Sequence, residues 1–360
     1  MTIRKILLFP LAVIYGIITW LRNRLYDFKI LKSKSFDIHT ICVGNLAVGG
    51  TGKTPHIEYL IKLLKEQFAI ATLSRGYKRK TKGFLMANEN STASDIGDEP
   101  LQYKTKNPFL TVAVDANRPN GVKKLMALQN PPDVILLDDA FQHRALKSEL
   151  NIVVSEYSHI YLNDCMLPAG NLREPKSGIK RADIIIISKT PDRVNAVDIR
   201  NLIKDIKPLS HQKLFFTWLQ YGELQPFKNA GESIHTLNEL FRYRIILFTG
   251  IGNPEPMVTY LKEYASSVKH IQYPDHHQFT LKNIADVRTE LDAIEGGNKI
   301  VVTTEKDAMR LMEPGLQDVV NTLPLFVLPI EVSFKEKEQE FNETIINYVR
   351  TNKFHHDKYS

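Results

Sequence analysis

The chain has 360 residues, of which 43% are hydrophobic and 24% charged, and its net charge is +7 with a pI near 9.1. This composition is ordinary for a globular protein and is sufficient for two α/β domains. Its two cysteines, Cys42 and Cys165, exclude a disulfide framework and lack metal-ligand spacing, which fits a reducing, cytoplasmic compartment. The positive charge favours nucleic acid, anionic lipid or phosphorylated substrates without choosing among them.

The N-terminal stretch contains an uncharged run, residues 6–21, with basic residues on both sides. The run is shorter than the about 20 residues that span a hydrocarbon core, and no A-x-A-like cleavage site follows it. We therefore expect a helix that lies in or dips into the membrane interface, with Tyr15 and Trp20 at headgroup depth. A helix buried on the protein's own core is the alternative. The basic residues expected to face acidic lipid are Arg22, Arg24, Lys29, Lys32 and Lys34.

A glycine-rich turn then separates an apolar run, residues 41–43, from a segment with apolar residues at helical spacing, which predicts strand, loop and helix. Because glycine lacks a Cβ, successive backbone N–H groups can close around an anion at the helix N-terminus. Lys53 and Thr54 follow where a P-loop places its phosphate-binding lysine and its Mg²⁺-binding hydroxyl, although Ala47 replaces the usual first glycine. An ordinary turn with a solvated lysine is the alternative. The predicted ATP-binding residues are Ala47, Val48, Gly49, Gly50, Thr51, Gly52, Lys53 and Thr54.

The next predicted strand, residues 69–73, ends in a basic loop that begins at Arg75 and either binds phosphates or is simply solvated. RNA binding is less favoured, because the loop has a single aromatic residue and no nucleic-acid module is recognisable elsewhere. Residues 97–100 then open a helix. There Asp98 is either an ordinary helix-start carboxylate or the general base of a phosphoryl-transfer site.

Two further strand ends carry polar residues. A strand expected over residues 109–114 is followed by Arg118, at the edge where open α/β sheets bind ligands. Four apolar residues, 134–137, run into Asp138 and Asp139, as in a Walker B strand that delivers a carboxylate to Mg²⁺. An apolar strand followed by aspartate is common by itself. Its occurrence after a glycine-rich loop makes the two patterns together indicate a nucleotide site. The predicted Mg²⁺ ligands are Thr54, Asp138 and Asp139.

The pattern of strands restarts near residue 150 and predicts a second, smaller α/β domain. Arg173 lies in an irregular loop and is either a ligand contact or a mobile surface residue. Farther on, Asp275 could orient His276 as in an acid–base pair, or His276 could be an exposed neighbour of a helix start. For residues 303–310 we expect a local ion pair only. Strands are expected at 151–154, 183–187, 214–218, 245–249, 268–272, 300–303 and 325–328, and helices from Pro256, Thr280 and Glu336.

A series of stretches in this order closely resembles the tetraacyldisaccharide 4'-kinase family. This family phosphorylates the 4'-hydroxyl of a tetraacylated glucosamine disaccharide 1-phosphate, a lipid A precursor. The resemblance runs from about Lys5 to Leu311, behind the membrane-like helix. The stretches are VGNLAVGGTGKTP, LSRGYKR, GDEP, VAVDANR, LLDDAFQHRAL, LPAGNLREP, FTGIGNPEPM, YPDHHQF and VTTEKDAMRL.

The resemblance implies an ATP- and Mg²⁺-dependent P-loop kinase that acts on a membrane-embedded lipid. Residues 47–54 would cradle ATP, and Asp98, assisted by His276, would be the general base for in-line attack on the γ-phosphate. Glu99 and Asp275 would support this pair. The candidates for contact with the substrate's 1-phosphate or sugars are Arg75, Arg118 and Arg173.

The expected fold is a P-loop NTPase-type parallel sheet domain with a second, smaller α/β domain. The expected division is a membrane-associated helix at 1–30, a P-loop kinase domain at 31–155, a second domain at 156–335 that closes over the active site, and a C-terminal helix and tail at 336–360.

The expected location is the cytoplasmic face of the inner membrane, peripheral or monotopic through the N-terminal helix. The expected partners are the lipid substrate and the membrane surface, with no nucleic acid and no obligate protein partner. A membrane ATPase or nucleotide switch, and a non-catalytic membrane-docked module, are the alternatives. A GTPase switch is disfavoured, because the nearest stretch to N-K-x-D, residues 188–191, lacks the aspartate.

Overall fold

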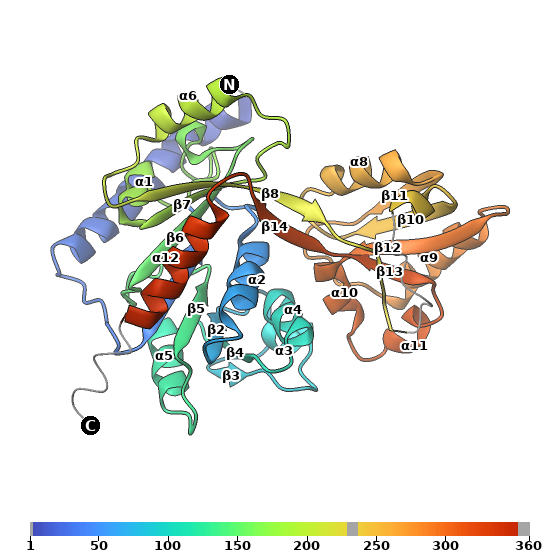
Figure 1. Cartoon of the computed structure of the whole chain (residues 1–360), viewed down its shortest axis with the longest axis horizontal. Coiled ribbons are helices and arrows are strands. Elements are labelled where there is room, and N and C mark those ends of the chain that lie inside the picture. Colours follow the sequence, from blue (N-terminus) through green and yellow to red (C-terminus); the bar gives the residue numbers. More distant parts are fainter. Residues whose placement is uncertain (1–2, 229–236, 352–360) are drawn as a thin grey trace.

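A computed structural model describes residues 3–228 and 237–351, and its two mostly parallel sheets lie in two bodies (Figure 1). The first sheet has the order β14-β8-β7-β6-β1-β5-β2-β4-β3, with antiparallel pairs only at its two edges. Its central strands are buried along their length, as expected for a parallel sheet covered on both faces. Its strands are β1 (His39–Gly44), β2 (Ile70–Ser74), β3 (Leu85–Met86), β4 (Thr111–Val114), β5 (Val134–Asp138), β6 (Leu150–Glu156), β7 (Ile184–Ser188), β8 (Lys213–Tyr221) and β14 (Ile330–Phe334).

Helices cover both faces of this sheet. The helices α2 (Lys53–Leu64), α4 (Asp98–Lys106) and α12 (Glu338–Thr351) contribute to the apolar cluster on one face. The helices α5 (Arg118–Met126) and α6 (Ala196–Ile206) contribute to the cluster on the other face. The remaining short helices of this body are α3 (Ala93–Ile96) and the 3₁₀ helices η1 (Tyr161–Asn163) and η2 (Lys176–Arg181).

The second sheet has the order β11-β10-β12-β13-β9 and is parallel except for β13 and β9. Its core continues into the first body, since Leu101 of α4 belongs to the same apolar cluster as Ala308 and Met309 of α10. Its strands are β9 (Gln225–Pro226), β10 (Tyr243–Thr249), β11 (Ser267–Gln272), β12 (Asn298–Thr304) and β13 (Leu325–Leu328). Its helices are α7 (Leu237–Leu240), α8 (Glu255–Tyr264), α9 (Leu281–Asp292), α10 (Glu305–Leu311) and α11 (Gln317–Val320).

The sheet topology corrects the expected division of the chain at residue 155. Strands β7, β8 and β14 pair within the first sheet, so most of the second body falls between β9 and β13. The chain crosses between the bodies along β8 and β14, an antiparallel ribbon in which Ile330 lies opposite Tyr221 (Figure 1). The alternation of strands and helices does not determine which sheet a strand joins. The predicted boundary at residue 155 was wrong for this reason. Helix α12 returns to the first body, and residues 352–360 of the expected tail lie outside the described residues.

The predicted strands all fall on observed strands. The three strands that sequence patterns did not predict, β3, β9 and β14, are short and antiparallel. Strands β3 and β9 have two residues each, which is too few for an alternating pattern to be distinguished from a loop. Strand β14 has five residues and is defined by its antiparallel pairing with β8.

The N-terminal helix α1 (Ile3–Asp27) packs on the first body through one stripe of residues along a single helix face. The Tyr15 hydroxyl donates to the carbonyl of Arg173 at 2.9 Å, and the Asn23 amide donates to Glu174 at 2.9 Å. The rest of the helix is open, with Leu7 72% and Ile18 60% exposed. By length and composition the segment Lys5–Asp27 is apolar enough to cross a membrane. Only 11% of an 18-residue apolar stretch within it is buried, which does not favour the alternative of a core helix.

Candidate active site

The glycine-rich loop between β1 and α2 is held open toward solvent. Gly49 and Gly52 have φ values of 115° and 89°, in the left-handed region that favours glycine. A Cβ at Gly49 or Gly50 would meet no atom within 4 Å, so there is room above the loop for a ligand. Ala47 instead forms an isolated antiparallel β-bridge with Leu172. Any residue can adopt the extended backbone of such a bridge. The absence of the first P-loop glycine is thereby explained.

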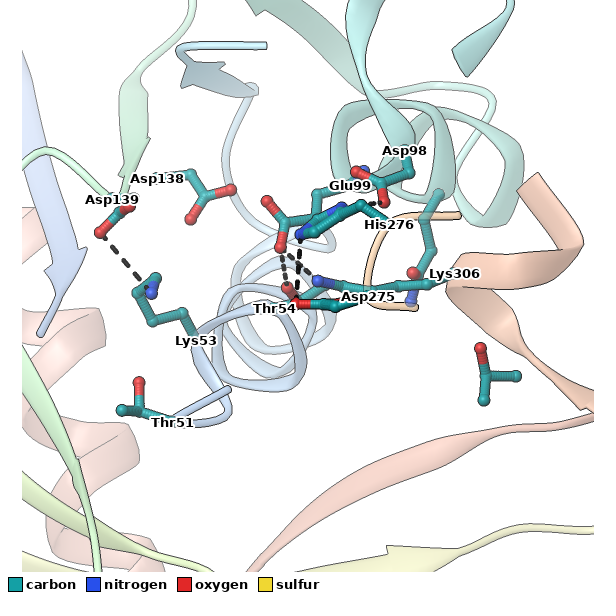
Figure 2. Close-up of polar contacts among 12 residues, drawn as sticks. Thr51, Lys53, Thr54, Asp98, Glu99, Asp138, Asp139, Asp275, His276 and Lys306 are labelled. Atoms are coloured by element: carbon teal, nitrogen blue, oxygen red, sulfur yellow. Dashed lines mark hydrogen bonds and ion pairs between the residues drawn. The ribbon is translucent and has the colours of Figure 1, made fainter. Parts of the chain in front are cut away.

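Lys53 and the two aspartates at the end of β5, Asp138 and Asp139, lie together beside this loop (Figure 2). The Lys53 ammonium lies 3.6 Å from Oδ1 of Asp139, so this lysine is not the solvated residue of the alternative interpretation. Arg173 donates to both oxygens of Asp139 at 2.9 Å. Burial opposes ionisation of Asp139, but Lys53 and Arg173 outweigh it and hold the pKa of that carboxyl below its usual range.

Asp138 has a different environment from its neighbour. It is buried, and burial together with the charges of Glu99 and Asp139 raises the pKa of Asp138 to about 7. The Tyr103 hydroxyl donates to its Oδ2 at 3.1 Å. Thr54, the other predicted Mg²⁺ ligand, donates to Glu99 at 3.3 Å. A cation near Thr54 would therefore find carboxylate and hydroxyl oxygens close by, and it would keep Asp138 ionised.

The donor set fits Mg²⁺ held jointly with a nucleotide. Within residues 3–228 and 237–351, no three His, Cys, Asp or Glu side chains form a cluster that could hold a metal alone. Mg²⁺ is commonly bound by one or two carboxylates, with phosphate oxygens and water completing its octahedral shell. The oxygens of Thr54 and Asp138 beside the glycine loop match this arrangement.

The two predicted catalytic residues meet although they are 178 positions apart. Asp98 is the first residue of α4, and its Oδ1 accepts from the backbone N–H of Glu99 at 3.0 Å. Its Oδ2 lies 3.1 Å from Nδ1 of His276, in the turn after β11 (Figure 2). His276 has a φ of 57°, and its backbone N–H donates to the carbonyl of Gly250 at 2.9 Å. Asp275 lies farther away, with its Oδ2 3.9 Å from Nε2 of His276.

Asp98 is ionised despite its position. It is 6% exposed, and burial alone would raise its pKa. The hydrogen bond to His276 and the charges of Lys306 and Arg310 act in the opposite direction and hold the pKa of Asp98 well below its usual range. A carboxylate of this kind is always charged at neutral pH and is well suited to orient an imidazole.

Sequence reasoning missed the helix that supplies these cations. For residues 303–310 we expected only a local ion pair, and the pair of Arg310 with Asp307 does exist at 2.7 Å. The same helix, α10, also reaches the first body, where Lys306 lies 2.5 Å from Glu99 and Arg310 contacts Asp98. Lys306 and Arg310 are four residues apart and so share one helix face, which is a signal that could have been used.

The three predicted substrate-binding arginines have different surroundings. Arg75 is exposed just after β2. Arg173 is engaged by Asp139, as described above. Arg118 is 2% exposed and donates to the backbone carbonyls of Asp115 at 2.7 Å and Asp138 at 3.2 Å. Its buried position contradicts direct contact with a substrate in this conformation, and Arg118 instead joins the ends of β4 and β5.

A cavity of about 130 Å³ adjoins the glycine loop on the side of β6. Strand β6 pairs with β1, and the chain proceeds from β1 toward one edge of the sheet and from β6 toward the other. Ligands of open α/β sheets bind at such a point, outside the carboxyl ends of the strands. Apart from Asn171, which lies in the stretch LPAGNLREP, no motif marked the lining residues outside the glycine loop. Besides the loop backbone, the cavity is lined by Glu156, His159, Asp164 and Asn171.

Comparison with known proteins identifies the family. A family model described as tetraacyldisaccharide-1-P 4'-kinase (LpxK) matches residues 4–350. The chain belongs to this family. The match extends beyond Leu311, where the resemblance in the sequence faded, and includes most of α12. The predictions of this family, of a kinase and of ATP as its cofactor are confirmed.

Relatives of similar length support the assignment to the LpxK family. Tetraacyldisaccharide 4'-kinase of Flavobacterium psychrophilum is 45% identical over 346 residues, 96% of each chain. That of Bacteroides thetaiotaomicron is 43% identical over 355 residues, 96% of this chain and 93% of the relative. The crystal structure of "apo" form LpxK from Aquifex aeolicus in complex with ATP has a TM-score of 0.72 at 30% identity, covering 96% of this chain and 99% of that one. The predicted P-loop-type α/β fold is thus confirmed.

Proposed function

We propose that this chain transfers the γ-phosphate of ATP to the 4'-hydroxyl of a tetraacylated glucosamine disaccharide 1-phosphate. The observation that carries the proposal is a hydrogen bond that connects the helix after the glycine loop to the residue next to Asp98. Thr54, the first residue after Lys53, is bonded to Glu99, which follows Asp98. A phosphate at the loop would therefore lie beside the pair, as in-line transfer to a hydroxyl requires.

In this proposal the P-loop residues bind ATP. Backbone N–H groups of residues 49–52 and the Lys53 ammonium hold the β- and γ-phosphates, and Lys53 exchanges its contact with Asp139 for phosphate oxygens. Thr54, Asp138 and Asp139 would hold Mg²⁺, which would supply positive charge beside the transferring phosphoryl group. The ribose of ATP fits the neighbouring cavity, where the carboxylates of Glu156 and Asp164 would accept from its hydroxyls.

The Asp98–His276 pair then acts on the acceptor. The pair orients the 4'-hydroxyl and takes its proton as the oxygen attacks the γ-phosphorus. Because Asp98 is fixed in the first body and His276 in the second, the pair exists only when the bodies are together. Exclusion of water at this contact would protect ATP from hydrolysis. Arg75, exposed near Tyr77, remains our candidate for contact with the substrate phosphate.

The test is transfer of labelled γ-phosphate from ATP to tetraacyldisaccharide 1-phosphate in mixed micelles. We expect a lipid product phosphorylated at the 4' position and no product when that position already carries phosphate. Release of inorganic phosphate without a lipid product would instead favour the membrane ATPase.

We further propose that α1 places the enzyme on the cytoplasmic face of the inner membrane as a monotopic protein. The stripe that contacts the first body extends from Ala12 to Asn23, so this length of helix lies along the protein surface. The opposite face carries Ile14 and Ile18, both more than half exposed, which suits insertion among acyl chains. The helix would then lie parallel to the membrane with one face in lipid.

Charged residues on that lipid-facing side should release the protein from membranes. For the double variant Ile14→Asp and Ile18→Asp we expect binding to vesicles containing phosphatidylglycerol to fall at least about tenfold, because each side chain loses about 1.5–3 kcal/mol of burial. Sedimentation with vesicles measures this. The matched control is Val197→Asp on α6, at a residue of similar exposure. Unchanged vesicle binding of the double variant would refute the proposed membrane face.

A further inference from the structure

Arg310, on helix α10 of the second body, makes contacts that no sequence motif predicted. We propose that Arg310 is a positioning residue that holds the Asp98–His276 pair assembled across the two bodies. This inference rests on the proposed function of that pair. Arg310 is not expected to touch ATP or the lipid; it would act through the residues it binds.

The guanidinium of Arg310 joins both members of the pair at once. Its Nε donates to Oδ2 of Asp98 at 3.2 Å, and its Nη2 donates to the same oxygen. That Nη2 also lies 3.2 Å from Nδ1 of His276. Arg310 is 4% exposed, so these contacts are made away from solvent, where charge-assisted bonds are strong. The carboxylate oxygen that faces the imidazole is therefore fixed by the arginine.

The other side of Arg310 is anchored in the second body. Its Nη1 donates to Asp307 at 2.7 Å and to the carbonyl of Gly250 at 2.9 Å. Asp307 is fully buried, and its Oδ2 accepts from the backbone N–H of Gly250 at 3.0 Å and from the hydroxyl of Thr304 at 2.8 Å. The guanidinium consequently has little freedom to change its orientation.

Gly250 provides a further connection between Arg310 and His276. Its carbonyl accepts from Arg310 and also from the backbone N–H of His276. A Cβ at Gly250 would lie 3.1 Å from Asp307 and from His277, so the position is closely packed. Arg310 thus sets both the position of the His276 backbone and the orientation of the carboxylate that faces its ring.

A purely structural role for Arg310 makes a different prediction. If Arg310 only held the two bodies together, any ion pair across the same contact would be equivalent. Lys106 of α4 provides such a pair, 2.6 Å from Glu305 of α10 and 2.6 Å from Glu58 of α2, and it does not contact Asp98 or His276. Lys106→Met is therefore the matched control.

The experiment is a double-mutant cycle on the full-length enzyme with ATP and lipid in micelles. We expect Arg310→Met to lower kcat about 100-fold, the cost typical of a misplaced catalytic group, with the KM for ATP within about twofold of wild type. Arg310→Lys should recover part of this loss, since lysine keeps the positive charge but lacks the planar guanidinium that can bond two atoms at once. In an Asp98→Asn background, Arg310→Met should cost less than about threefold more, because the two residues act as a unit. Lys106→Met should leave kcat within about threefold.

Three outcomes would overturn the proposal. They are wild-type kcat in Arg310→Met, equal losses in Arg310→Met and Lys106→Met, or full additivity of Arg310→Met with Asp98→Asn. If Arg310→Met does not fold, as judged by its melting temperature, Arg310→Lys is carried through the same cycle. Wild-type kcat in Asp98→Asn alone would instead refute the proposed function of the pair, which keeps the two failures distinct.

Discussion

Asp98→Asn is expected to lower kcat for lipid phosphorylation by about 10²–10⁴-fold, the usual contribution of a positioned acid–base group. Asparagine keeps the size of the side chain at the start of α4, and its oxygen can still accept from Arg310, so the variant should fold. It lacks the negative charge that faces Nδ1 of His276 and so cannot support transfer of the hydroxyl proton. Binding of ATP should remain, because the glycine loop is unchanged.

His276→Ala should give a loss of the same order, and the double variant should be little worse than either single one, since the two residues form one functional unit. The measurement is steady-state transfer of labelled phosphate to lipid, with ATP affinity measured separately. Asp275→Asn tests the support that the resemblance implies for Asp275. Because Asp275 is exposed and its Oδ2 lies 3.9 Å from Nε2 of His276, we expect its loss to lower kcat less than about threefold. Wild-type kcat in both Asp98→Asn and His276→Ala would show that the base lies elsewhere.

The predicted site residues that local sequence patterns alone could place beside one another are those whose chemistry is local. Lys53 and Thr54 directly follow the glycines that shape their loop. Asp138 ends a buried strand, and Asp139 follows it. In each case a few neighbouring residues specify both the backbone and the side chain at its end. That the two segments lie together follows from one general property of parallel sheets, whose carboxyl ends share an edge.

The contact between Asp98 and His276, in contrast, does not follow from local sequence patterns. Its only support in the sequence was resemblance to a family, because nothing local to either residue indicates a partner 178 positions away. Arg310 was missed for the same reason. Its local partner Asp307 gave a sufficient explanation of the charges, and the contact with Asp98 depends on how α10 packs on α4.

The position of the domain boundary does not follow from hydrophobic patterns. The strand at β7 is as apolar as any in the chain, and its pattern is satisfied in either sheet. Its assignment to the first sheet is made by pairing with β6, and β14 returns to the first sheet after the whole second body. Sheet membership is thus a property of tertiary pairing that hydrophobic periodicity does not encode.

Lys53→Met is expected to lower kcat/KM for ATP by about 10²–10³-fold, the cost of removing one preorganised group that stabilises transferring charge. The Lys53 ammonium is the cation of the glycine loop, and methionine retains most of its apolar length without its charge. Asp139 keeps its two bonds from Arg173, so the carboxylate remains paired and the fold should be retained. The matched control is Lys62→Met on the same helix, where an exposed lysine pairs with Glu331 at 3.6 Å and little effect is expected.

The comparison of Lys53→Met with Asp98→Asn separates the two halves of the proposed site. Loss of Lys53 should weaken both ATP binding and phosphoryl transfer, because the ammonium contacts phosphate in the ground state and more strongly as charge develops. Loss of the Asp98 charge should slow transfer and leave nucleotide affinity nearly intact. Measurement of ATP binding by calorimetry beside lipid phosphorylation distinguishes these patterns. Lipid phosphorylation at the wild-type rate in Lys53→Met would contradict the role of the glycine loop, whatever the result at Asp98.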